Sequence, residues 1–185
     1  MGPGAVLPTA LLAWVLLIGA RPQPWTIQRD ASSIVMSVNA FGTTSTGRFE
    51  DWRGDIAFDP ASPRQTQATV TVQAASLRLR PAVATAQATG PAFLDVVRHP
   101  TIRVQLRALE PTGGDRHTAR ADVTLKGVTR PVTFPVDLRV TGDSAQMTGE
   151  FTVDRSAFGI GTSGLWNSVV ARQVTVRVSL QARRN

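Results

Sequence analysis

Apolar and polar residues alternate along most of this chain, and that period of two is the feature that most constrains its fold. Residues 119–140 show it twice: alternate positions are apolar from Ala119 to Leu125 and again from Val132 to Val140, with a break at Lys126-Gly127. Because successive side chains of a strand point to opposite faces, each run predicts a strand with one buried face. Pro135 lies inside the second run, and its missing N–H indicates a bulge or a weakly paired position.

Comparable apolar rows recur along the chain with turn-forming residues between them. They are Ile34, Met36, Val38 and Ala40; Ile56 and Phe58; Val70 and Val72; Ile102, Val104, Leu106 and Ala108; Met147, Gly149, Phe151 and Val153; and Val174, Val176, Val178, Leu180 and Ala182. With the two runs above, this gives about eight strands joined by short turns. Such a pattern predicts an all-β antiparallel barrel or sandwich.

One long stretch, residues 77–100, interrupts the strand pattern with alanine and threonine where the strands have valine. A short helix over residues 82–88, ended by Gly90-Pro91, fits this composition, and a further turn is expected over residues 92–97.

The inward rows determine whether such a barrel would be hollow. Several inward positions are small, which leaves volume for a ligand: Ala40, Ala108, Ala119, Ala121, Gly149 and Ala182. In the alternative, large side chains fill the middle and the barrel is solid: Phe49, Trp52, Phe58, Phe134, Phe151 and Trp166. The pattern alone leaves both alternatives open.

Residues 2–20 carry no charge and contain an apolar run from Leu11 to Ile18, ending in Gly19-Ala20. This pattern predicts a secretory signal peptide over residues 1–20 with cleavage after Ala20, although the basic residue that usually lies near the start of such a peptide is missing. The apolar run is short for a membrane span, so the alternative is an uncleaved N-terminal anchor. We therefore expect one domain over residues 21–185 and a periplasmic or secreted location.

Composition argues against several classes of partner and ligand. There is no cysteine, and the net charge is +7, with Lys126 the one basic residue that is not arginine. The arginines are scattered rather than clustered, and tyrosine is absent, so a solvated basic exterior is expected rather than a nucleic-acid site.

No catalytic constellation stands out. His99 and His117 have no metal-ligand spacing to another His or a carboxylate, and the segment GIGTSG (159–164) has the composition of a loop. Glu50 and Asp51 point to opposite sides of an extended chain. We therefore expect no enzyme activity, no metal and no cofactor.

Five motifs occur along the chain in this order: WTIQRDASSIVMSV, GRFEDWRGDIAFDP, AFLDVVRHPTIRV, LKGVTRPVTFPV and DRSAFGIG. In this combination, over residues 25–182, the chain resembles the YceI-like family of exported, lipocalin-like proteins. The resemblance implies an eight-stranded antiparallel barrel with a helix beside its mouth, and both apolar rows of residues 119–140 facing its lumen. It also implies a polyisoprenoid lipid, of the quinone or polyprenyl phosphate type, in that lumen. The chain departs from the family at residues 82–89, which are small and neutral, so the resemblance does not determine the shape of the mouth.

The candidate lumen residues are Phe49, Trp52, Phe58, Val104, Val123, Phe134, Val136, Phe151, Arg155, Phe158 and Val176. Arg155 continues the inward row of Phe151 and Val153, and a buried guanidinium needs partners. These would be an internal carboxylate or strand-end carbonyls, in a structural clasp, or else a lipid head group. A ligand-free, solid-cored interaction module is the alternative function, and transient membrane contact and homodimerisation are left open.

Overall fold

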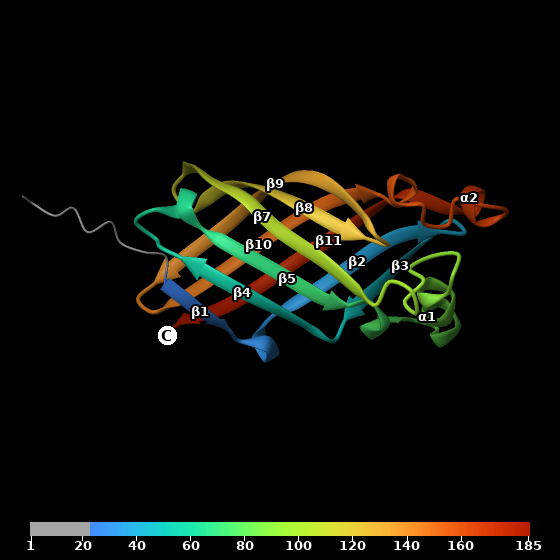
Figure 1. Ribbon diagram of the computed structural model, residues 1–185, viewed down its shortest axis with the longest axis horizontal. Helices are drawn as coiled ribbons and strands as arrows, with labels where there is room; N and C mark the ends of the chain where they lie inside the picture. The colour runs from blue at the N-terminus through green and yellow to red at the C-terminus, as the bar shows by residue number, and fades with distance from the viewer. Residues whose placement is uncertain (1–22) are drawn as a thin grey trace, which may run out of the picture.

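The structure, a computed structural model, describes residues 23–185, which form one antiparallel barrel with two short helices at one end (Figure 1). The predicted signal peptide and its cleavage site lie outside the described residues. The strands are β1 (Gln23–Ile27), β2 (Ser33–Ala40), β3 (Thr43–Phe49), β4 (Trp52–Phe58), β5 (Gln67–Gln73), β6 (Leu77–Leu79), β7 (Thr101–Gly113), β8 (Arg116–Leu125), β9 (Val128–Thr141), β10 (Ser144–Asp154) and β11 (Val170–Arg184). The helices are α1 (Ala82–Thr89) and α2 (Trp166–Val169), with 3-10 turns η1 (Arg29–Ala31), η2 (Pro63–Gln65), η3 (Ala74–Ser76) and η4 (Arg155–Phe158).

The sheet closes on itself. Pairing runs β1-β4-β5-β7-β8-β9-β10-β11, and β11 returns to pair with β1, so eight strands form a ring. Closure removes the free edges of these eight strands, and β6 alone among the described strands lacks a strand on one side. The predicted fold class, an eight-stranded antiparallel barrel with a short helical insert, is confirmed.

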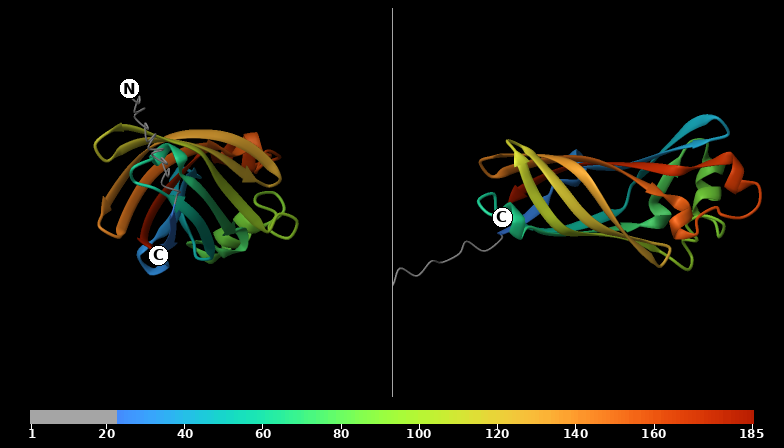
Figure 2. Two further views of the ribbon diagram at one scale, coloured as in Figure 1. Left: turned by 60° about the vertical axis from the view of Figure 1, so that its left-hand side comes forward. Right: turned by 90° about the horizontal axis from the view of Figure 1, so that it is seen from above.

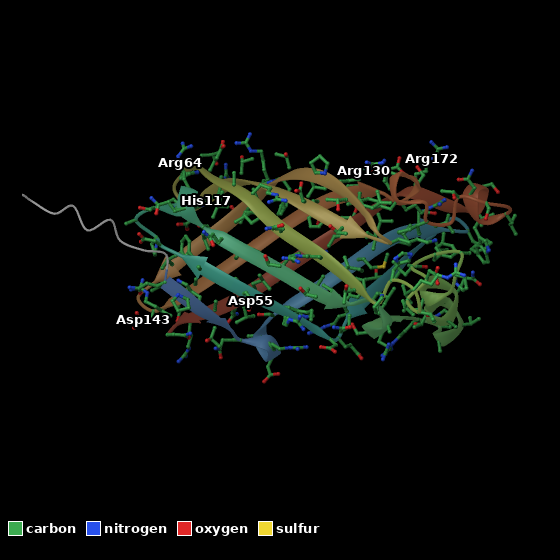
Figure 3. The ribbon with its side chains drawn as sticks, viewed as in Figure 1. Asp55, Arg64, His117, Arg130, Asp143 and Arg172 are labelled. Carbon is green, nitrogen blue, oxygen red and sulfur yellow. The ribbon has the colours of Figure 1, made fainter. Side chains whose placement is uncertain are left out.

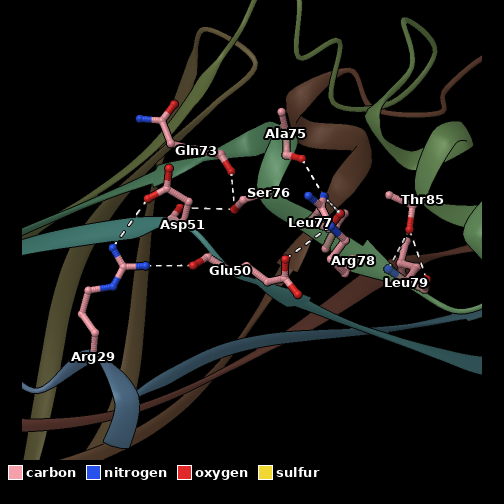
Figure 4. Close-up of polar contacts among 10 residues, drawn as sticks. All are labelled: Arg29, Glu50, Asp51, Gln73, Ala75, Ser76, Leu77, Arg78, Leu79 and Thr85. Atoms are coloured by element: carbon pink, nitrogen blue, oxygen red, sulfur yellow. Dashed lines mark hydrogen bonds and ion pairs between the residues drawn. The ribbon is translucent and has the colours of Figure 1, made fainter.

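Three of the eight strands are bent, and the part beyond each bend carries a separate label. The bent strands are β1 with β2, β4 with β3, and β5 with β6. In their second halves, β11 pairs with β2, β2 with β3, and β3 with β6. Polar contacts hold the bends together (Figure 4). The Arg29 guanidinium donates to the carbonyl of Glu50 at 2.8 Å, and the Ser76 hydroxyl donates to the carbonyls of Gln73 and Asp51.

The two alternating runs of residues 119–140 are β8 and β9, and their apolar rows face the same interior. Their connection is the two-residue turn Lys126-Gly127, with φ of 51° and 76°. Two successive positive φ angles are those of a type I′ hairpin turn, which suits the twist of the flanking strands. The turn coincides with the break in alternation at Lys126-Gly127, because Val128 already belongs to β9. Pro135 pairs in register with Thr118 of β8 without the bulge that was one of the two expectations, and it lies next to Val136, where pairing with β10 ends.

One predicted inward residue requires correction. The β7–β8 register shifts between Leu106 and Ala108, which reverses the faces of β7 beyond that point. Ala108 therefore does not face the interior, and Leu109 takes the inward position, where it is buried.

The strand connections alternate between the two ends of the barrel. One end holds the β2–β3 hairpin, the segment from β6 through α1 to β7, the β8–β9 turn and the segment from η4 to α2; we call this the mouth end (Figures 1 and 2). The opposite end, here the narrow end, holds the other turns and the chain's C-terminus. Helix α1 matches the helix expected over residues 82–88. Among residues 23–185, no helix has the length and apolar character needed to span a bilayer.

Candidate functional site: an apolar cavity inside the barrel

The barrel is hollow. A cavity of about 660 Å³ runs inside it, bordered by side chains from the strands, from α1 and from Trp166 of α2. This volume lies within the ~300–1,000 Å³ typical of small-molecule sites. The lining is almost entirely hydrocarbon; the polar side chains that border it are Thr43, Ser45, Thr66, Gln87 and Arg155. Of the two interiors that the sequence left open, the structure has the hollow one.

Nine of the eleven predicted lumen residues border this cavity: Phe49, Phe58, Val104, Val123, Phe134, Val136, Phe151, Arg155 and Val176. The other two require correction. Trp52 follows the bend between β3 and β4 and packs in a core cluster with Phe49 and Leu77 without bordering the cavity, and the Arg29 guanidinium lies 5.4 Å from the centroid of its ring. Phe158 lies in η4 and is buried against Phe151 and Ile160 instead of facing the cavity.

Two aromatic side chains close the narrow end. The ring centroids of Trp25 and Phe58 lie 5.8 Å apart, and the Trp25 indole N–H donates to the Phe58 carbonyl at 2.9 Å. Both residues are buried and cluster with Ala182 of β11, the strand on the other side of β1. Since both also border the cavity, this pair forms its inner end.

The cavity reaches the exterior at the mouth end. Four of its lining residues are exposed, namely Phe41, Thr43, Pro81 and Val83. They belong to the β2–β3 hairpin and to the start of α1. β6 pairs with β3 only from Gly47 to Phe49, so the hairpin tip extends beyond β6 without a strand beside it. The opening therefore lies between the β2–β3 hairpin and α1.

Aromatic rings from three separate segments meet beside this opening. The Trp166 ring packs edge-on against Phe41 of the hairpin, with centroids 6.2 Å apart, and against Phe93, which follows α1, at 5.5 Å. All three border the cavity. The sequence analysis placed Trp166 only among side chains that could fill the barrel, and its partners Phe41 and Phe93 had no periodic signal because they lie outside the strands.

Helix α1 covers a gap in the wall, because β7 pairs with β5 and not with β6. The helix is attached to β6 by the Thr85 hydroxyl, which accepts from the Leu79 amide at 2.8 Å and donates to the Leu79 carbonyl at 3.1 Å (Figure 4). It thereby replaces the strand that β6 lacks on that side. The small residues Ala84 and Ala88 let the helix lie close to the cavity, and Gln87 borders it.

Among the described residues that border the cavity, Arg155 is the one basic side chain, and it is fully engaged within the chain. It is 2% exposed, and its five N–H groups donate to five main-chain carbonyls: Ala171 from Nε, Ile160 and Gly161 from Nη1, and Trp166 and Val170 from Nη2. A guanidinium has five N–H donors, so none is left for a lipid head group. The geometry is that of a structural clasp that holds the η4–α2 segment onto the start of β11.

Next to the clasp, Asp154 caps η4. Its carboxylate accepts from the Ser156 hydroxyl at 2.6 Å and from the Ser156 amide at 2.8 Å. These two hydrogen bonds lower the pKa of Asp154 below its ordinary value. Burial lowers the pKa of Arg155, and the neighbouring Asp154 charge opposes that shift.

The histidines do not take part in the cavity. His117 lies at the start of β8 with Nδ1 3.1 Å from the Asp115 carbonyl oxygen, and the His99 ring lies beside Gly127. Within the described part of the chain, no three His, Asp or Glu residues come together as a metal site would require.

An eight-stranded barrel that encloses an apolar cavity and opens at one end defines the lipocalin-like class of binding proteins. Within that class, the chain belongs to the YceI-like family, since the family model of the YceI-like domain matches residues 25–182.

Curated relatives include UPF0312 proteins of pseudomonads. The one from Pseudomonas syringae pv. tomato is 28% identical over 135 residues, which cover 70% of this chain and 70% of that protein. The one from Pseudomonas fluorescens is 31% identical over 124 residues, covering 64% of this chain and 65% of that protein.

Solved structures show the same barrel. Burkholderia cenocepacia BcnA is 26% identical with a TM-score of 0.79, covering 84% of this chain and 98% of that one. A polyisoprenoid binding domain from Saccharophagus degradans is 13% identical with a TM-score of 0.70, covering 88% of this chain and 99% of that one. At 13% identity, the second likeness shows a shared fold.

Proposed function

We propose that this protein binds one polyisoprenoid lipid inside the barrel and carries it without chemical change. The observation that carries the proposal is the apolar cavity of about 660 Å³ whose exposed lining residues all lie at one end of the barrel. A long, branched hydrocarbon chain matches such a space, because each methyl and methylene group inside it meets hydrocarbon instead of water. The Saccharophagus degradans domain, which shares the fold, is described as polyisoprenoid binding, and this supports the same ligand class here.

Burial of the chain supplies the affinity. At ~25 cal/mol for each Å² of apolar surface removed from water, a ligand of several isoprene units gains more free energy than ordering it costs. Polar contacts are then needed only to orient the head.

The polar lining residues near the opening favour an uncharged head. Thr43, Ser45 and Gln87 offer hydroxyl and amide groups, and the Arg155 donors are all occupied. A carbonyl or hydroxyl oxygen is matched by neutral partners, whereas a phosphate needs charge-assisted hydrogen bonds to bind well. Of the two head types that the family resemblance implies, the side chains along the cavity therefore favour the quinone type over the polyprenyl phosphate type, because the unpaired mouth-end arginines do not border the cavity.

The protein is proposed to act outside the cytoplasm, in the periplasm or as a secreted protein. Residues 2–20 carry the pattern of a signal peptide, and a carrier without cysteine has no dependence on the redox state of its compartment. Without chemistry on the ligand, it requires neither metal nor cofactor.

Lipid extraction tests the proposal. The protein is purified without detergent, and the extract is analysed by mass spectrometry alongside titration with a hydrophobic fluorescent probe. We expect an isoprenoid lipid at up to one molecule per chain, and probe binding that the lipid competes away. A folded protein that yields no lipid and gives no probe signal would instead support the ligand-free interaction module.

A further inference from the structure

We infer that the mouth end of the barrel docks on the surface of an anionic lipid bilayer. The inference rests on the proposed lipid carriage and names the partner with which lipid is exchanged. It draws on two features of the mouth end, its exposed apolar side chains and its excess of basic residues, and on the position of the cavity opening between them.

Apolar side chains project into solvent at this end. Within residues 23–185, the exposed large hydrophobic residues are Phe41, Val83, Val97 and Leu165, at 64%, 73%, 92% and 64% exposure. All four lie in mouth-end segments: the β2–β3 hairpin, α1, the connection from α1 to β7, and the residue before α2. Exposed apolar residues gathered around one opening mark an interaction surface.

The charge distribution selects the partner. The mouth-end segments, residues 38–46, 78–100, 124–131 and 153–174, hold seven basic and two acidic residues. The narrow-end segments, residues 23–27, 58–68, 110–118, 136–146 and 180–185, hold five of each. Figure 3 shows Arg130 and Arg172 toward the mouth end and Arg64 and Asp143 at the narrow end. Most of the net charge of +7 therefore lies where the apolar residues project.

Part of this excess is paired or buried: Arg78 pairs with Glu50, Arg98 with Asp95, and Arg155 is buried. Asp95 is buried and pairs with Arg98, with the nearest nitrogen and oxygen 3.7 Å apart, and Asp154 is held by Ser156. Arg80, Arg130 and Arg172 are exposed and make no ion pair within the described chain. Apolar side chains that enter the interface and basic side chains that meet anionic headgroups are the two components of peripheral membrane binding.

A bilayer fits better than a second copy of the chain. A two-fold dimer through the mouth would bring two identical basic rims together, and their like charges would repel. Docking on a bilayer places the opening between Phe41 and Val83 against the hydrocarbon boundary, so that the lipid chain enters the cavity without crossing water.

Vesicle flotation tests the inference on the full protein, with phosphatidylcholine vesicles compared with vesicles that also contain phosphatidylglycerol. We expect binding to the anionic vesicles that weakens as salt is raised. The double variant Arg130→Gln/Arg172→Gln should lower that binding on the order of tenfold. Val97→Ser/Leu165→Ser should lower binding through lost apolar contact. None of these four side chains borders the cavity, so probe binding in solution should be unchanged.

The matched control is Arg64→Gln/Arg183→Gln, which removes two exposed charges from the narrow end and should leave vesicle binding unchanged. Equal loss from the narrow-end variant would overturn the inference, because it would show attraction by net charge alone. A wild-type protein that binds the probe but does not bind anionic vesicles would also overturn the inference. The same holds if the only effect of the mouth-end variants is to dissociate a dimer. Vesicle binding without probe binding would instead contradict the proposed lipid carriage and still support the docking surface.

Discussion

The Thr85 hydroxyl of α1 accepts a hydrogen bond from the amide of Leu79 and returns one to the carbonyl of the same residue. This side chain thus completes the unpaired side of β6. Replacing Thr85 by valine keeps the volume and removes both bonds, at a cost of about 1–2 kcal/mol in the free energy of unfolding. Hydrogen exchange of the Leu79 amide should accelerate. Thr89→Val is the control, since the Thr89 hydroxyl bonds only to carbonyls of its own helix. Equal protection of Leu79 in both variants would contradict the role of Thr85.

Replacing Arg155 by methionine should destabilise the barrel and weaken the binding of all lipids to the same extent. The change removes the five hydrogen bonds that the guanidinium donates, and we expect a loss of about 3 kcal/mol or more in the free energy of unfolding, measured by denaturant titration. Arg172→Met removes an exposed arginine of the same region and serves as the control. A stable Arg155→Met protein that selectively loses phosphate-bearing lipids would show that the guanidinium binds the head group.

Overfilling the cavity should displace the ligand. Val176 faces the cavity between Met36 and Phe151 on the neighbouring strands, and tryptophan in its place should cost about 1–3 kcal/mol and abolish probe binding. Val123→Trp should act in the same way. Thr175→Trp is matched, because Thr175 lies on the opposite face of the same strand, and it should bind the probe normally. Similar losses at positions 175 and 176 would mean that the ligand does not lie inside the barrel.

The Asp154 cap predicts a pH-dependent contribution to stability. Its pKa is lowered in the folded state, so its contribution is complete above the ordinary carboxyl pKa of about 4 and is lost as the pH falls through the lowered value. The difference in Tm between the wild type and Asp154→Asn should therefore be largest near neutral pH and shrink in acid. A difference that is constant from neutral pH into strong acid would show that the charge of Asp154 is irrelevant to the cap.

The strand rows were predictable from the sequence because alternation is a local property. Residues such as Val123, Val136 and Val176 were placed on the inward face from period alone, and they border the cavity. The errors have two sources: the bulge in β7 exchanged Ala108 for Leu109, and Trp52, at the start of β4, packs in the core cluster without bordering the cavity.

The mouth could not be predicted in the same way. Its residues come from a hairpin tip, a helix and two irregular segments, and no period relates Phe41 to Trp166. The partners of Arg155 were equally hidden, because main-chain carbonyls carry no sequence signal. That a buried arginine needs partners was predictable from the cost of burying a charge, but which groups supply them depends on the path of residues 160–171.

The central claim, that an isoprenoid chain lies inside the barrel with its head at the mouth, is tested most directly by photo-crosslinking. An isoprenoid quinone with a photoreactive group at the far end of its chain is bound to the protein, irradiated, and the adducts are mapped by mass spectrometry. We predict adducts at the inner end of the cavity, on Trp25, Phe58 or Leu138, and their loss in Val176→Trp. Adducts confined to the outer faces of the strands, or unchanged by Val176→Trp, would contradict the claim.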